Sequence, residues 1–438
     1  MMMRDGPGQA TAVSLTPVSL DSDSRAFRIA HSLAEEGLNS LVIEGRASKC
    51  RFWGTEIEVR SAENQNAAAT PLDGSGAPLR NTVNALRRGQ LGKVGELALY
   101  SGFRGYDWWR HCRQPRHLLP PAHLYYLHSF ELYRVVAPIA SRLGAKVIYD
   151  AHDFYRGIEP AERQSSFDRN WVRPFLNEIE DRLVADANAV VTVSDGVADL
   201  MTDAFGRRPV VIRNCHDERL DRPVTRDLRT ELGLAPEDNL CVVVGNWKPG
   251  MAVTVAVEAL ACLPDRFHLA FLGRGYDKAA PVLSSALVGR RIHFGRFAAP
   301  DEVVPAIRTA DMGLVIYEPY SDNYRSALPN GFFQIIAAGL PLVRAPLTEI
   351  EAIIGDSQVG VCLTRLDPTA LANAIELCAG NSEALGINTT ALARRLRWQI
   401  EATRLRSLVA ELLDAPATSE HGRTVRSLPM EKNKACAG

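Results

Sequence analysis

The sequence predicts an α/β fold with parallel sheets and more than one domain. Apolar strand patterns alternate with helical patterns along most of the chain, as in the run from His123 to Tyr155, where two strands flank a helix. A strand–helix–strand unit of this kind builds a parallel sheet. The 438 residues provide enough chain for two or three domains with sizeable cores.

The composition is that of a globular protein: 46% of the residues are hydrophobic and 23% are charged. The net charge of −1 gives no overall reason to expect nucleic-acid binding. No apolar run approaches the ~20 residues of a membrane-spanning helix, and the first residues lack the apolar core of a signal peptide. We therefore expect a cytoplasmic protein. The eight cysteines show no C-x-x-C spacing, which predicts reduced thiols rather than disulfides or metal ligands.

The first predicted unit is a short strand within 12–20, a helix and a second strand. In DSDSRAFRIAHSLAEEGLNSLVIEG (21–45), Asp and Ser supply helix caps, Gly37 ends the helix and LNSLVIE forms a buried strand. This stretch resembles the D-R-x-x-R-I-A-x-x-L-A-x-x-G segment of glycosyltransferase family 4. The resemblance implies that Asp23 and Arg25 lie on the acceptor side of an active-site cleft. Helix capping and surface charge are the alternative role for each residue.

A basic, aromatic stretch follows an irregular region. Its cations and tryptophans are Arg87, Arg88, Lys93, Arg104, Trp108, Trp109, Arg110, His111, Arg113, Arg116 and His117. Cations interleaved with tryptophan suit a surface of anionic lipids, which contributes about 1 kcal/mol per cation. Many family 4 enzymes use lipid-linked acceptors, so peripheral contact at the inner membrane face is one hypothesis. Solvated loop charges over packed tryptophans are the alternative. Sedimentation with and without anionic liposomes distinguishes the two.

The segment 123–155 carries the strongest candidates for the first domain. It resembles the family segment H-A-H-D-x-x-x-x-P-A-A followed by K-V-V-Y-D-x-H-E. Ligands bind at the carboxyl ends of parallel strands, which predicts that His128, Asp150, His152 and Asp153 face the cleft. The resemblance implies that His152 contacts the donor sugar near the reacting carbon and that His128 and Asp153 lie on the acceptor side. A lone histidine with a structural role is the alternative.

The next segment, 170–217, resembles the family pattern E-R-x-L-x-x-x-A-D-x-V-I-T-V-S followed by V-V-x-N. Its strands end at Ser194 and Asn214, which we expect to face the cleft. The polar run 219–239 holds two prolines and predicts a domain boundary. We expect an N-terminal acceptor domain over 1–220, a donor domain over 221–390, a crossover helix over 391–414 that returns to the first domain, and a disordered tail over 415–438.

The start of the second domain departs from the family pattern V-G-R-x-x-x-x-K-G-V. Asn246 stands at the arginine position and Met251 at the lysine position. In the family these two cations neutralise the donor diphosphate, which is the main electrostatic task of such a site. Lys248 lies between them, and Arg274 and Arg296 follow later strands. Each is a candidate replacement.

The segment 327–345, ALPNGFFQIIAAGLPLVRA, predicts a helix beginning at Pro329 and Asn330, where Asn supplies the cap, and ending at Gly339 before a buried strand. The N-terminus of such a helix is a seat for phosphate. The segment resembles the family 4 donor sequence PNK-F-FEY-AAG-P-V. Gly331 replaces the lysine, and Gln334 replaces the second glutamate of the E-x7-E motif, which binds the ribose. Ser326 stands at the first glutamate.

The resemblance implies a GT-B fold, with two Rossmann-like domains and the active site between them. The implied activity is retaining transfer of a hexosyl group from a UDP- or GDP-type nucleotide-sugar. The acceptor would be a glycan, a lipid-linked sugar or a small molecule, and the pathway glycan or glycoconjugate (polysaccharide) biosynthesis. The resemblance implies no cofactor and no metal site. His152 and Lys248 are the expected catalytic residues. The expected donor site comprises Asn246, Arg274, Ser326, Leu328, Pro329, Asn330, Gly331, Phe332 and Gln334. Because four charged positions are lost, a non-catalytic scaffolding partner of an active enzyme is an alternative, and an epimerase or hydrolase is another.

Overall fold

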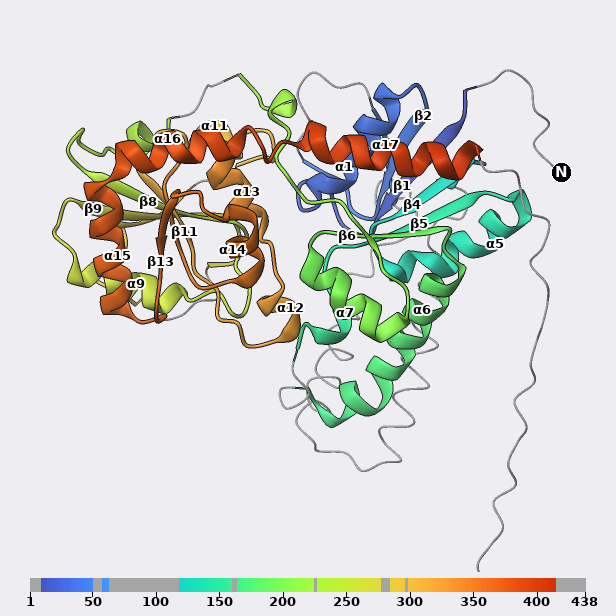
Figure 1. Cartoon of the computed structure of the whole chain (residues 1–438), viewed down its shortest axis with the longest axis horizontal. Helices are drawn as coiled ribbons and strands as arrows, with labels where there is room; N and C mark the ends of the chain where they lie inside the picture. The colour runs from blue at the N-terminus through green and yellow to red at the C-terminus, as the bar shows by residue number, and fades with distance from the viewer. Residues whose placement is uncertain are drawn as a thin grey trace, which may run out of the picture.

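The structure, a computed structural model, describes residues 9–49, 57–62, 118–159, 164–223, 227–276, 284–295 and 298–414. Two α/β domains lie side by side, each built on one sheet (Figure 1). Every strand pair in both sheets is parallel, which confirms the α/β prediction.

The first domain holds a seven-stranded sheet in the order β3-β2-β1-β4-β5-β6-β7. Its strands are β1 (Thr11–Thr16), β2 (Asn39–Glu44), β3 (Glu58–Ser61), β4 (Leu124–Leu127), β5 (Lys146–Ala151), β6 (Ala189–Thr192) and β7 (Val210–Val211). Its helices are α1 (Ser24–Glu35), α5 (Tyr133–Leu143), α6 (Arg173–Asp186) and α7 (Asp195–Phe205), with short turns of helix at Phe130–Leu132, Tyr155–Gly157, Asp168–Val172 and Glu218–Leu220.

The second domain holds a six-stranded sheet in the order β10-β9-β8-β11-β12-β13. Its strands are β8 (Asn239–Val244), β9 (Phe267–Leu272), β10 (Ile292–Phe294), β11 (Met312–Val315), β12 (Leu342–Arg344) and β13 (Gly360–Cys362). The helices that follow Leu220 are α8 (Leu228–Glu231), α9 (Val253–Cys262), α11 (Val303–Ile307), α12 (Asp322–Arg325), α13 (Asn330–Ala337), α14 (Thr348–Ile354), α15 (Pro368–Gly380), α16 (Ser382–Ala393) and α17 (Trp398–Asp414).

The two sheets share one topology, and this positions the site. Strand order runs outward in one direction from β1 and in the other from β4, and the same reversal separates β8 from β11. In open parallel sheets, ligands bind beyond the carboxyl ends of the strands at this reversal. The residues that follow β1, β4 and β5 in the first domain, and β8 and β11 in the second, are therefore the places to look for a site.

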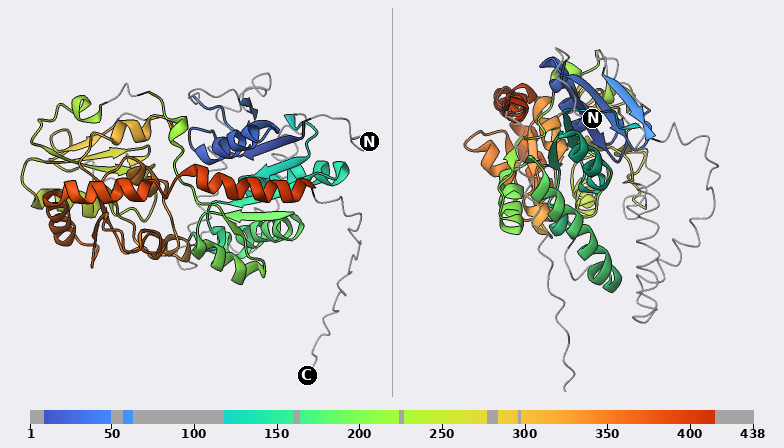
Figure 2. Two further views of the ribbon diagram at one scale, coloured as in Figure 1. Left: turned by 45° about the horizontal axis from the view of Figure 1, so that its top comes forward. Right: turned by 90° about the vertical axis from the view of Figure 1, so that its right-hand side faces the viewer.

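Helix α17 returns from the second domain to the first, where it packs beside α1 (Figure 2). Trp398, at its start, is fully buried, and its Nε1 donates to Ser32 Oγ at 2.8 Å. The apolar faces of α1 and α17 cover one side of the first sheet, and α5, α6 and α7 cover the other. The second domain has a single core in which Phe332 of α13 is fully buried.

The predicted caps are correct in one helix and wrong in another. Asp23 precedes α1 and its carboxylate accepts from the amide of Ala26, as predicted. At α13 the cap position is Pro329, without a side-chain hydrogen bond, and Asn330 is the first helical residue. The predicted Asn330 cap is wrong because its side-chain oxygen accepts from Asn214 Nδ2 instead. Gly339, at φ +77°, follows the helix as expected.

Some predictions fall outside the described residues. They are the basic, aromatic stretch at 87–117, Arg296, and the tail 415–438. The lipid-surface hypothesis therefore stays a prediction. Among the helices that the structure describes, none combines the length and apolarity needed to cross a membrane.

Candidate active site

A cavity of about 910 Å³ lies between the carboxyl ends of the two sheets. The first domain contributes residues that follow β1, β4 and β5, among them Asp23, His128 and His152. The second domain contributes the loop after β8 and the start of α13. The volume is that of a small-molecule site. The strand order of each sheet reverses next to this cavity, and we therefore identify the cavity as the candidate active site.

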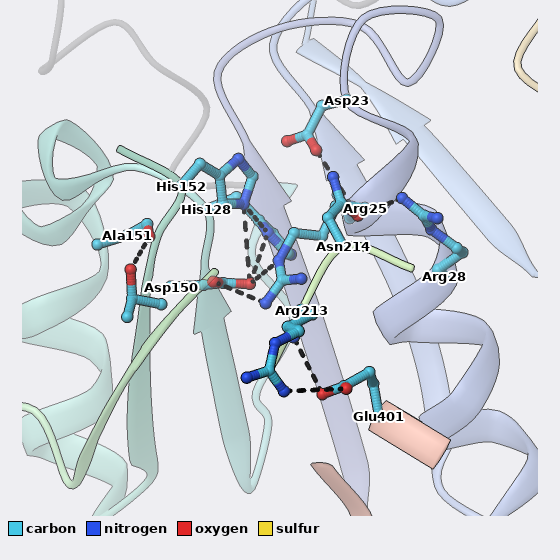
Figure 3. Close-up of polar contacts among 12 residues, drawn as sticks. Asp23, Arg25, Arg28, His128, Asp150, Ala151, His152, Arg213, Asn214 and Glu401 are labelled. Atoms are coloured by element: carbon cyan, nitrogen blue, oxygen red, sulfur yellow. Dashed lines mark hydrogen bonds and ion pairs between the residues drawn. The ribbon is translucent and has the colours of Figure 1, made fainter. Parts of the chain in front are cut away.

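Two histidines and a carboxylate meet on the first-domain wall (Figure 3). Leu127 of β4 is level with Tyr149 of β5, so the residues after them also lie side by side. His128 Nδ1 lies 3.1 Å from His152 Nε2. Asp150 Oδ2 is 3.5 Å from His128 Nδ1 and 3.7 Å from His152 Nε2. Because β4 and β5 are paired in this register, residues 128, 150 and 152 lie close together in space although they are distant in sequence.

Asp150 is held by Arg25 of α1. Arg25 Nε donates to Asp150 Oδ2 at 2.7 Å, and its Nη2 donates to Oδ1 at 3.1 Å. Both side chains are buried, with exposed fractions of 1% and 0%. Burial by itself raises the pKa of Asp150, but the Arg25 charge together with His152 and His128 outweighs burial and holds this pKa far below its usual range. Arg25 lies at the cavity wall as predicted, yet the structure commits its guanidinium to Asp150.

The pKa values of the two histidines are shifted in opposite directions. Burial lowers the pKa of His128 to about 4, although Asp23 and Asp150 act against it. Burial also lowers the pKa of His152, but the carboxylates of Asp23 and Asp150 outweigh it, so this pKa is raised. These opposite shifts favour His152 Nε2 as the donor and His128 Nδ1 as the acceptor of the contact between the two rings. Both residues line the cavity, but the side chain of His152 is 24% exposed whereas that of His128 is fully buried.

Helix α13 forms the second-domain wall. Leu328, Pro329, Asn330, Gly331 and Gln334 line the cavity. The amides of Asn330 and Gly331 come before the first amide that can bond within the helix, so the positive end of its dipole faces the cavity.

Phe332, expected at the donor, differs from its neighbours. Its ring is buried in the core, and its amide donates to Pro329 O at 2.9 Å. Neither group is available to a donor, so this expected contact is not supported.

The structure gives physical reasons for two of the lost cations. A Cβ on Gly331 would lie 2.5 Å from the Val244 carbonyl oxygen, so a lysine does not fit without a backbone shift. Met251 is 8% exposed and belongs to the core of the second domain, while its sulfur accepts from the Lys248 amide at 3.3 Å. Both positions serve packing instead of charge.

Of the remaining residues predicted at the donor, some line the cavity and others lie outside its lining. Lys248 and Asn246 are exposed and line the cavity. Arg274 is exposed but is not part of the cavity lining, and its amide donates to Asn246 Oδ1 at 2.9 Å. Ser326 is also outside the lining, and its carbonyl accepts from Ser194 Oγ at 2.9 Å. Of the two predicted replacement cations that the structure describes, Lys248 and Arg274, Lys248 is the one at the cavity.

Comparison with known proteins agrees with this geometry. Residues 25–215 match the family model described as glycosyl transferase 4-like domain, and residues 238–381 match the model described as glycosyl transferases group 1. The chain belongs to this glycosyltransferase family. A search of curated protein sequences returns no significant match.

Solved structures similar to this glycosyltransferase share its GT-B fold. Sucrose-phosphate synthase from Thermosynechococcus elongatus is 14% identical with a TM-score of 0.63, and the match covers 92% of this chain and 99% of that chain. Anabaena HepE, in complex with UDP-glucose, is 16% identical with a TM-score of 0.60 and coverage of 92% and 100%. WaaG, a glycosyltransferase involved in lipopolysaccharide biosynthesis, is 15% identical with a TM-score of 0.59 and coverage of 91% and 99%.

Sequence reasoning missed two features of this glycosyltransferase. The first is an apolar part of the first-domain wall, lined by Phe130, Tyr155, Ile158, Val172 and Leu176. The second is Asn323 of α12, whose Nδ2 donates to Asp153 at 3.0 Å and whose Oδ1 accepts from the Phe154 amide at 2.7 Å across the domain boundary. The short helix around Asn323 carries no periodic signal that could have indicated this role.

Proposed function

We propose that this glycosyltransferase moves a hexosyl group from a UDP- or GDP-type nucleotide-sugar to an acceptor hydroxyl, with retention of configuration. The observation that carries the proposal is the shared cavity, which has His152 on one wall and the N-terminus of α13 on the other. Retention rests on the family resemblance. Glycans, lipid-linked sugars and small molecules are the candidate acceptors.

The residues have complementary roles in this proposal. The amides of Asn330 and Gly331 and the dipole of α13 stabilise the diphosphate, and Lys248 adds a full charge. Gln334 offers one carbonyl oxygen to the ribose in place of a carboxylate. His152 donates a hydrogen bond to the donor sugar, and we assign Asp23 and Asp153, which line the same cavity, to the acceptor side. Stabilisation of charge on the leaving diphosphate lowers the barrier to transfer.

The loss of charge at Gly331 and Met251 favours one competing function, a non-catalytic scaffold that binds no nucleotide-sugar. A thermal-shift panel of UDP, GDP, ADP, TDP and CMP separates the two. A nucleotide present at about 100 times its dissociation constant stabilises the native state by roughly 2.7 kcal/mol. We expect a shift with UDP or GDP, followed by product formation whose anomeric configuration is read by NMR. A flat panel would favour the scaffold.

A further inference from the structure

We propose that Asp23, His128 and His152 form a binding site for one divalent transition-metal ion of the zinc type. The three residues come from different elements: the cap of α1, the end of β4 and the residue after β5. Each offers one ligand atom, and these atoms lie within 4.8 Å of one another. All three residues line the cavity, so an ion can enter from solvent.

The spacing of the two rings suits a common ion. Ligand nitrogens at ~2.0–2.1 Å from a tetrahedral zinc ion lie roughly 3.4 Å apart. The observed separation of His128 Nδ1 from His152 Nε2 is 3.1 Å, which requires only a small adjustment. The Asp23 carboxylate already accepts from Thr16 Oγ1 and the Ala26 amide. Because a carboxylate has about four lone-pair sites, it can keep both bonds and still bind an ion.

The type of ligand selects the type of ion. Two imidazoles and one carboxylate favour Zn²⁺, Co²⁺ or Ni²⁺ over Mg²⁺ or Ca²⁺, which prefer oxygen ligands. Three protein ligands leave a fourth position open to water or substrate.

The surroundings support the site electrostatically. Asp150 lies 3.5 and 3.7 Å from the two ring nitrogens and is fixed by Arg25. These are the nitrogens that would bind the ion, so the Asp150 carboxylate also lies close to the proposed ion position. The Arg25 charge is offset by Asp150, which leaves the Asp23 carboxylate to attract a cation.

One consequence rests on the proposed function. His152 is also the residue that we place at the donor sugar, so an ion and a nucleotide-sugar compete for it. Zinc should therefore inhibit transfer, and inhibition should weaken as the donor concentration rises. In this proposal the reaction does not require the ion. The proposed site nevertheless differs from our sequence-based expectation of no metal site.

The test uses the untagged full-length protein after treatment with a chelator. Zn²⁺ is titrated by calorimetry, and Co²⁺ is followed by its visible absorption. We expect one ion per chain in the wild type. His152→Ala and His128→Gln should each weaken binding by more than ~100-fold, because loss of an outer partner alone costs ~10–100-fold. Thermal melting checks that each variant is folded, and the partly exposed His152 is the safer position to change.

The second domain offers a matched control. His268 Nδ1 lies 3.1 Å from His293 Nε2, the same separation as in the proposed site, and Asp238 lies 3.7 Å from His268. His268→Ala should leave the ion in place. Absence of binding in the wild type, or binding that survives both His152→Ala and His128→Gln, would overturn the proposal. Binding at these residues without inhibition would support the metal site and count against the donor position of His152.

Discussion

At the scale of single residues, the site depends on a buried ion pair that no substrate needs to touch. Arg25 and Asp150 are almost completely buried and bonded through two contacts. Removing one partner of a buried pair leaves an uncompensated charge, which costs about 3–5 kcal/mol. Asp150→Ala should therefore lower the free energy of unfolding in urea by this amount. The double variant Arg25→Met/Asp150→Leu should lose much less, and equal losses in both proteins would contradict the ion-pair account.

A second residue-scale prediction concerns Lys248, the predicted cation that the structure places at the cavity. A hydrogen bond to a charged group contributes about 1.5–3 kcal/mol, which corresponds to roughly 10–150-fold in kcat/KM. Lys248→Ala should reduce kcat/KM for the nucleotide-sugar by this factor or more. Lys146→Ala is the control because Lys146 begins β5, at the end of the sheet away from the cavity. If Lys248→Ala had unchanged kcat/KM, the assignment of Lys248 to the diphosphate would be wrong.

The sequence predicted some site residues better than others for a physical reason. His128 and His152 follow apolar strands and Asp150 lies at the end of one, and the carboxyl ends of parallel strands share one edge, so their convergence was predictable. The commitment of Arg25 to Asp150 was not, because it depends on a contact between residues that lie 125 positions apart. The burial of Phe332 was not predictable either, because the helical phase that buries its ring depends on packing in the complete core.

At the scale of elements, α13 shows how packing and charge compete for one position. The helix approaches β8 so closely that a Cβ on Gly331 would lie 2.5 Å from the Val244 carbonyl oxygen. The bounds and the glycine stop of α13 were predictable from local sequence, whereas this approach is a tertiary contact. From the sequence alone, glycine in place of lysine at position 331 suggests a lost function. The structure gives a packing reason instead, because α13 lies so close to the sheet that position 331 has no room for a side chain.

Restoring the family residue tests this interpretation. Gly331→Lys should destabilise the protein by about 1–3 kcal/mol through overpacking, and it should not strengthen nucleotide binding. Thermal melting and titration with UDP or GDP measure the two effects. Gly380→Lys, at the end of α15, controls for the added charge and the loss of a helical glycine, because a Cβ at Gly380 would meet no atom within 4 Å. Tighter nucleotide binding in Gly331→Lys, with unchanged stability, would contradict the packing explanation.

At the scale of the whole molecule, polar bridges join the two domains around the cavity. Arg28 of α1 donates to Asn214 Oδ1, and Asn214 Nδ2 donates to Asn330 at the start of α13. Ser194 donates to the carbonyl of Ser326. These contacts link the first domain directly to the start of α13 and the segment before it. The fold class could be predicted from local patterns, but the closure of the two domains could not, because each bridge pairs residues from separate folding units.

The bridges made by Asn323 and Glu349 allow domain closure to be tested. Asn323 makes two bonds to the segment after β5, and Glu349 of α14 accepts from the Gly196 amide at 3.0 Å. A typical hydrogen bond contributes about 0.5–1.5 kcal/mol, so Asn323→Ala/Glu349→Ala should weaken the closed arrangement by about 1.5–4.5 kcal/mol. Small-angle scattering of the variant should give a larger radius of gyration than the wild type, and a saturating nucleotide-sugar should reduce the difference.

Glu351→Ala is the matched control for that experiment. Glu351 lies on the same helix, but it pairs with Arg344 at 3.2 Å within the second domain, so its loss leaves the bridges intact. The control should scatter like the wild type. If the double variant did so as well, with unchanged nucleotide affinity, the closed arrangement would not depend on these bonds. Closure would then rest on the remaining contacts, chiefly the packing of α17 against α1, because this helix is the covalent continuation of the second domain and its Trp398 is buried in the first.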